Sequence, residues 1–140
     1  MKVDRIAQGK AAVVLDHAFW ASMLMNQTMV EDNSIPTLAV DSRGKLYYNK
    51  EFVEGLPIQQ VVFGLCHEIG HIMGKHAIRR GSRDPKRWNY AGDAWINDML
   101  RECGVGEPIP NTVNMPGSKD KTTEQIYDEL PEGEIGRAHV

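Results

Sequence analysis

The motif H-E-I-G-H at residues 67–71 constrains the fold of this 140-residue chain more than any other stretch of its sequence. Two histidines four positions apart project from the same side of the chain when the segment is an α-helix, because successive residues turn by about 100°. Apolar residues recur at helical spacing from Val62 to Met73, and the proline at residue 57 suits a first helical turn. The pattern therefore predicts a helix over residues 57–75.

The same motif predicts a metal site on that helix. His67 and His71 share one face and can bind a single Zn²⁺ at about 2.0–2.1 Å. Glu68 lies on the same side but is angled away from the ligand position, so it can act as general base toward a water molecule. The alternative is a core helix whose histidines only form hydrogen bonds within the fold. The polar face shared by both histidines and the glutamate favours the metal site.

A catalytic zinc site has three protein ligands and one open position, so a third ligand is required. On a straight helix His76 would point about 130° away from the metal-binding face, and it can reach the metal only if the chain breaks at Gly74. Asp93 is the other candidate, because its carboxylate lies among Ala, Gly and Trp residues, where a charge needs a partner. We favour Asp93, and we expect Asn97, one turn later, to hold the other ring nitrogen of a histidine ligand.

The first half of the chain predicts a long helix followed by a hairpin. Residues 4–31 contain few helix-breaking residues and predict one continuous helix. Residues 37–40 and 45–48 flank a turn that ends in Gly44, a pattern typical of a β-hairpin. The apolar residues of the long helix that we expect to be buried are Val13, Val14, Ala18, Trp20, Leu24 and Met25.

The second half predicts two further helices. Asp84 followed by Pro85 is a strong helix start, and the helix is expected to end near Cys103, before Gly104. A capping box at Thr122 opens a short helix that ends at residue 130. Residues 131–140 are expected to form a disordered tail. Together these segments predict an α+β fold in a single domain spanning residues 1–140.

Composition and charge exclude several classes of protein. No stretch approaches the roughly 18–20 apolar residues needed to cross a bilayer. The N-terminus does not resemble a signal peptide, so we expect no membrane association and a cytoplasmic location, with Cys66 and Cys103 as free thiols. The net charge of −3 makes nucleic acid an unlikely partner. Only residues 75–87 are strongly basic, and they indicate a solvated loop or, alternatively, a site for an acidic substrate or phosphate.

Several stretches of the sequence together point to a known kind of domain. They are residues 40–49 (VDSRGKLYYN), 67–71 with His76, 79–80, 83–97 and 124–128. From Ile6 to Leu130 the chain resembles the metallopeptidase domain at the N-terminus of bacterial metal-dependent peptidases in which a von Willebrand factor A-like domain usually follows. The resemblance implies a zincin-like fold with His67, His71 and Asp93 at the metal. It also implies Glu68 as base, and it adds a regulatory domain or a partner protein to the expected partners.

We therefore expect a zinc metallopeptidase, a hydrolase that cuts peptide or protein substrates with Glu68 as general base. The strand at residues 45–48 is expected to form the rim of the cleft and to pair with an extended peptide. Tyr47, Tyr48 and Tyr90 are candidates for a hydrogen-bond donor to the oxyanion. The alternative function is a non-catalytic, zinc-stabilised module that binds a partner protein without cutting it.

Overall fold

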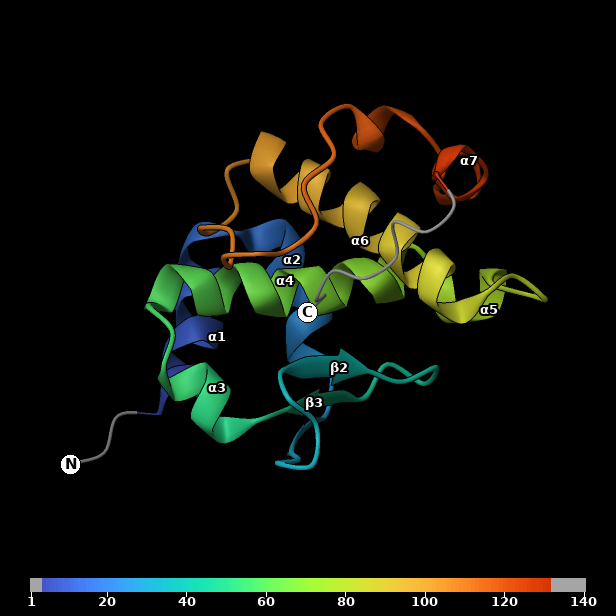
Figure 1. Cartoon of the computed structure of the whole chain (residues 1–140). Helices are drawn as coiled ribbons and strands as arrows, with labels where there is room; N and C mark the ends of the chain where they lie inside the picture. The colour runs from blue at the N-terminus through green and yellow to red at the C-terminus, as the bar shows by residue number, and fades with distance from the viewer. Residues whose placement is uncertain (1–3, 132–140) are drawn as a thin grey trace.

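The computed structural model describes residues 4–131, and it arranges helices around one central helix with a three-stranded sheet on one side (Figure 1). This mixture confirms the α+β class expected from the sequence. In chain order the elements are α1 (Arg5–Asp16), α2 (Ala18–Met25), β1 (Met29–Glu31), β2 (Leu38–Val40), β3 (Leu46–Tyr48), α3 (Lys50–Glu54), α4 (Ile58–Met73), α5 (His76–Arg79), α6 (Pro85–Glu102), the 3₁₀ turn η1 (Ser118–Asp120) and α7 (Thr123–Glu129).

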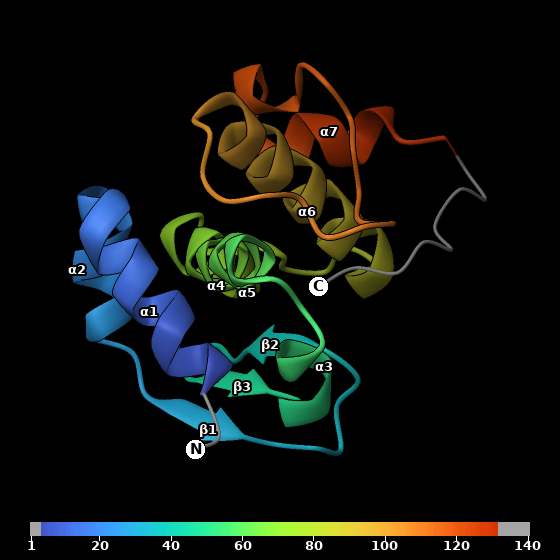
Figure 2. The ribbon, with the colours of Figure 1, turned by 90° about the vertical axis from the view of Figure 1, so that its left-hand side faces the viewer.

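Helix α4 is the central element, and Figure 2 shows it nearly end-on, with α1 and α2 on one side, α6 on another and the sheet below. Every residue from 61 to 70 is buried. A helix that is buried on all its faces lies inside a core rather than at its edge. The helix confirms the predicted segment to within two residues at each end, with Pro57 as its N-cap. The H-E-I-G-H motif is thus held in the middle of the fold.

The N-terminal region departs from the single helix expected over residues 4–31. The first helix ends at Asp16, and the backbone of His17 (φ −136°, ψ 64°) separates it from α2. Residues 29–31 form strand β1, which pairs in parallel with β3. Pairing with a strand distant in sequence overrides the local helical pattern. Of the residues expected to be buried, Val13, Trp20 and Leu24 are buried, whereas Val14, Ala18 and Met25 are exposed.

The sheet has the order β1-β3-β2, so β3 is its central strand and β2 is an edge strand. Strands β2 and β3 form the predicted antiparallel hairpin, with Val40 opposite Leu46. Gly44 in the turn has a φ of +84°, which glycine adopts without strain. The Asp41 carboxylate stabilises the turn by accepting hydrogen bonds from the backbone N–H groups of Arg43 and Lys45.

The C-terminal helices begin where their capping residues predict. The Asp84 side chain accepts a hydrogen bond from the Arg87 N–H, and Pro85 is the first residue of α6. Thr122 and Gln125 form the reciprocal capping box of α7. The segments α3, α5 and η1 were not expected. Residues 132–140 of the predicted disordered tail lie outside the described residues.

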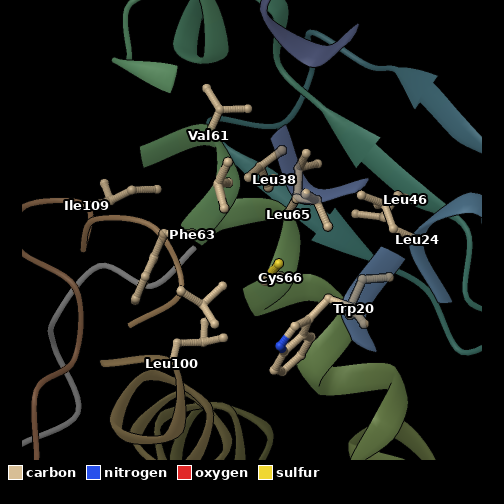
Figure 3. Packing of buried hydrophobic residues seen from close by; sticks show 14 of the residues in the cluster. Trp20, Leu24, Leu38, Leu46, Val61, Phe63, Leu65, Cys66, Leu100 and Ile109 are labelled. Carbon is tan, nitrogen blue, oxygen red and sulfur yellow. The ribbon is translucent and has the colours of Figure 1, made fainter. Parts of the chain in front are cut away.

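Apolar side chains from the helices and the sheet meet around α4 to form the main core, part of which Figure 3 shows. Cys66 lies within this core, where burial raises the pKa of its thiol to about 12. Cys103 is exposed, and both cysteines are free thiols, as expected. Between residues 4 and 131, none of the helices combines the length and the apolar character that crossing a membrane requires.

Candidate metal centre

Three side chains from two neighbouring helices meet at one point. His67 and His71, one turn apart on α4, place their Nε2 atoms 3.2 Å from each other. Asp93 from α6 places its Oδ1 atom 3.0 Å from each of these nitrogens. His67 and Asp93 are each 1% exposed, while the side chain of His71 is 15% exposed and opens the group to one side. The group is therefore buried but accessible from one direction.

Glycines allow the two helices to approach closely enough for this meeting. A Cβ atom on Gly70 would lie only 2.7 Å from Cγ2 of Ile96, so a larger residue at position 70 would push α6 away from α4. A Cβ atom on Gly92 would lie 3.0 Å from Nδ1 of His76. Position 70 is one of the two variable positions of the H-E-x-x-H motif, and here its lack of a side chain sets the helix separation.

The three donor atoms fit a zinc ion. Ligands placed tetrahedrally at 2.0–2.1 Å from zinc lie about 3.3–3.4 Å from one another, close to the separations of 3.0–3.2 Å between these atoms. Two imidazole nitrogens and one carboxylate oxygen are also a ligand set that zinc accepts in catalytic sites. Electrostatics agree: burial alone lowers the pKa of His67, but the Asp93 carboxylate outweighs it and raises this pKa to about 9. The site thus favours a positive charge among its three donor atoms.

Asn97 determines which nitrogen of His67 faces the centre. The Asn97 amide nitrogen donates to the Val113 carbonyl at 3.0 Å, which turns its Oδ1 atom toward His67 Nδ1 at 2.7 Å. Because this oxygen only accepts, Nδ1 of His67 carries a hydrogen and donates it. In the neutral imidazole, Nε2 then has a lone pair directed at His71 and Asp93. The contact expected between Asn97 and a histidine of the motif is present.

His71 is oriented through a second histidine. Its Nδ1 atom lies 3.0 Å from Nδ1 of His76, whose Nε2 lies 2.9 Å from Oγ1 of Thr123 on α7. Burial, followed by the nearby charges of His71 and Arg79, lowers the pKa of His76 to about 3, so His76 is neutral. A neutral His76 can accept from His71 Nδ1 and donate to Thr123. This arrangement directs the lone pair of His71 Nε2 toward the centre.

The helix that carries the motif ends just before Gly74, and this is the break that His76 needs in order to approach the site. Helix α4 ends at Met73, Gly74 is its C-cap, and Lys75 has a left-handed backbone with a φ of +52°. His76 therefore turns inward and is buried, and Trp88 Nε1 donates to its carbonyl at 2.7 Å. Both ring nitrogens of His76 are engaged with His71 and Thr123. Asp93, and not His76, shares the donor group with the motif histidines.

A cleft of about 710 Å³ opens onto this group. Glu68, His71 and Asp93 line it, so the glutamate of the motif and the donor group face the same space. The Glu68 side chain belongs to the buried interior, with 2% of the residue exposed. The opposite wall is β2 and the turn that follows it, residues 38–44. The Glu68 carboxylate and the donor group therefore share a space large enough for a peptide segment.

The strand at the cleft is not the one expected. Residues 46–48 form the central strand β3, which is paired on both sides, so the expectation that residues 45–48 form the rim is wrong. Residues 38–40 of β2 take that place. Asn49 N–H donates to the Thr37 carbonyl and Asp41 N–H to the Lys45 carbonyl. In an antiparallel ladder the alternate residues Leu38 and Val40 then direct their backbone groups away from β3.

The structure differs from the sequence-based expectation for the tyrosines proposed as oxyanion donors and for the residues that contact His76. Tyr47, Tyr48 and Tyr90 do not line the cleft, and Tyr47 donates to the Asp41 carboxylate instead. Thr123 and Trp88, which hold His76, were not recognised as part of the site. Thr123 is separated from His76 by 47 residues, and nothing in its local sequence indicates this contact.

The whole of this chain, apart from its last residue, matches a known protein family. Residues 1–139 match the model of a protein family described as "Putative metallopeptidase domain". No curated protein and no solved structure matches the chain significantly.

Proposed function

The chain belongs to this family of metallopeptidase domains, and on that premise we propose that it is a zinc-dependent peptidase. In this proposal His67, His71 and Asp93 hold the metal and Glu68 is the general base. A helix that carries the H-E-x-x-H motif and lies along the edge strand of a sheet also supports a zincin-like fold.

One observation carries the proposal: the three donor atoms converge within 3.0–3.2 Å of one another, and two of their residues, His71 and Asp93, line the same cleft as Glu68. A structural metal site is closed by a fourth protein ligand, whereas a catalytic site keeps one position open. Among the described residues the group contains three ligands, and His71 leads from it into the cleft. The arrangement supports a catalytic site more than a purely structural one.

Zinc in such a site supplies Lewis acidity, which makes water nucleophilic at neutral pH and polarises a peptide carbonyl. The contribution of the chain itself is proton transfer. A carboxylate oxygen of Glu68 accepts the proton of the attacking water and then donates it to the nitrogen of the departing amine. Asn97 and His76 keep His67 and His71 in the tautomers that leave their Nε2 atoms available.

Strand β2 is the proposed binding edge for the substrate. The backbone groups of Leu38 and Val40 point away from β3, and both residues line the cleft. An extended peptide can add to this edge as a further strand, so the main chain provides affinity without requiring one particular sequence. The scissile bond would then lie across α4, above Glu68 and His71.

Substitution of the base tests the proposal. The wild type and Glu68→Gln are purified, their zinc content is measured, and both are incubated with a mixed peptide library that is read by mass spectrometry. We expect about one zinc per chain in both proteins. Hydrolysis should fall at least about a hundredfold in Glu68→Gln, because only the proton acceptor is lost.

The same experiment separates a peptidase from a non-catalytic zinc-stabilised module. Such a module would bind zinc and give no cleavage with either protein. Equal cleavage by both proteins would assign the activity to a contaminant. Absence of zinc from both, after incubation with excess metal and desalting, would remove the metal site itself.

A further inference from the structure

Three positively charged side chains surround the open part of the cleft. Arg43 comes from the turn between β2 and β3, Lys75 from the junction of α4 and α5, and Arg80 from the end of α5. All three are exposed, and none of them forms an ion pair within residues 4–131. Their charges are available to a bound molecule.

The neighbouring arginines of the same basic segment are used differently. Arg79 pairs with Glu124 on α7 and donates to the Gly74 carbonyl at 2.6 Å. Arg87 donates to the backbone carbonyls of Tyr127 and Leu130. These two arginines attach α7 to the rest of the fold, whereas Lys75 and Arg80 face the cleft. The structure thus divides the basic segment into a structural part and a part that faces the proposed substrate.

Of the acidic residues that line the cleft only Asp41 is partly exposed, so one accessible negative charge offsets one of the three cations. The Asp41 carboxylate accepts hydrogen bonds from two backbone N–H groups of its turn and from the Tyr47 hydroxyl. Glu68 and Asp93 belong to the buried metal centre. The accessible part of the cleft therefore has an excess of positive charge, although the net charge of the whole chain is −3.

The cations are gathered at one end of the cleft. A Cβ atom on Gly64 would lie 2.7 Å from Cδ1 of Leu38, and one on Gly44 would lie 3.7 Å from Cδ1 of Ile72. Strand β2 therefore runs alongside α4, with the hairpin turn near the C-terminal end of that helix. Arg43, in that turn, therefore lies at the same end of the cleft as Lys75 and Arg80, which follow α4.

We propose that the cleft selects acidic peptides, with Asp or Glu side chains within a few residues of the scissile bond on the side that lies at the hairpin turn. This inference rests on the proposed peptidase function and names its class of substrate. Exposed ion pairs each contribute about 1.4–5-fold in affinity, so three of them together give a preference of about tenfold. Because the cations are exposed, salt should reduce the preference.

The test compares peptides that carry three glutamates beside the cleaved bond with peptides that have glutamine at the same three positions. The proteins are the wild type, the triple variant Arg43→Gln/Lys75→Gln/Arg80→Gln, and the control Lys86→Gln. Lys86 is an exposed cation of α6 that does not line the cleft. Cleavage is measured as kcat/KM, and circular dichroism checks that each variant is folded. Binding of fluorescent peptides is measured on zinc-loaded Glu68→Gln with and without the triple change, so that this measurement does not depend on turnover.

We expect the wild type and Lys86→Gln to cleave the Glu peptides about tenfold better than the Gln peptides, and the triple variant to lose this difference. Equal binding of both peptides by Glu68→Gln, or retention of the preference in the triple variant, would overturn the inference. A single-stranded oligonucleotide that binds more tightly than the acidic peptide would also overturn it. If no protein cleaves but the binding preference is present and requires the three cations, the inference stands and the peptidase proposal fails.

Discussion

Replacing Asn97 by alanine should weaken zinc binding, because Asn97 is the group that fixes the tautomer of His67. The substitution removes the acceptor at 2.7 Å from His67 Nδ1, and His67 is 1% exposed, so water cannot readily replace it. The ring is then free to place its hydrogen on Nε2, the nitrogen that must be unprotonated to bind a metal. Groups that orient a metal ligand in this way typically contribute about 10–100-fold in metal affinity.

The structure also predicts a loss of stability in the metal-free form, for which the sequence pattern alone predicts little change. Asn97 joins α6 to the segment after it by donating to the Val113 carbonyl. That carbonyl keeps a second donor, Arg101 Nη1 at 3.1 Å, so the buried group left without a partner is mainly the N–H of His67. One unsatisfied buried polar group costs about 1–3 kcal/mol of unfolding free energy.

A matched control separates metal binding from general destabilisation. Thr112→Val removes another buried hydrogen bond, from Oγ1 to the Ile109 carbonyl, at a position outside the donor group. Zinc affinity is measured by competition with a chromogenic chelator, and stability by urea denaturation of both forms. We expect Asn97→Ala to lose both affinity and stability, and Thr112→Val to lose stability only. A zinc dissociation constant for Asn97→Ala within about twofold of the wild type would refute the reasoning.

Three further outcomes follow from the contacts around the site. Thr123→Val should lower zinc affinity several-fold and Thr123→Ser should restore it, because serine keeps the hydroxyl that contacts Nε2 of His76, the histidine behind His71. A chelator titration that finds Val and Ser alike would contradict this. Iodoacetamide at pH 7.5 should label exposed Cys103 in the folded protein and buried Cys66 only after unfolding, as peptide mass mapping would show. The hydrogen bond from Arg79 lowers the pKa of Glu124, so its contribution to stability is present above the ordinary pKa of a glutamate and is lost as the pH falls through the lowered pKa. Glu124→Gln should therefore lower the melting temperature at pH 7, and the difference from the wild type should shrink as the pH is lowered.

The parts of the fold that the sequence predicts well are those set by neighbouring residues. Helix α6 begins at Asp84 and Pro85 because a capping carboxylate and a proline favour a helix start wherever they occur together. The capping box of α7 and the turn at Gly44 are local in the same sense. Such signals remain valid in any tertiary surrounding, so a single sequence is enough to use them.

Strand β1 and the edge of the sheet depend on contacts that no local pattern contains. Residues 29–31 are compatible with a helix and become a strand because Val30 pairs with Tyr47. That pairing also makes β3 the central strand and leaves β2 as the edge. Two hairpin strands look equivalent in sequence, and only the partner from the N-terminal region decides which of them faces the cleft.

Part of the proposed metal centre is likewise predicted by neighbouring residues, and part depends on contacts between distant ones. The spacing of His67 and His71 is local, and an acidic residue among Ala, Gly and Trp residues is unusual enough to indicate Asp93. The sequence presented His76 and Asp93 as alternatives for one ligand position. The structure gives them separate positions, because the left-handed backbone at Lys75 brings His76 behind His71 and Asp93 approaches from α6. His76 then connects the centre to Thr123, so the docking of α7 and the orientation of His71 depend on each other. A helix that supplies none of the three donor atoms thus becomes part of the proposed metal site.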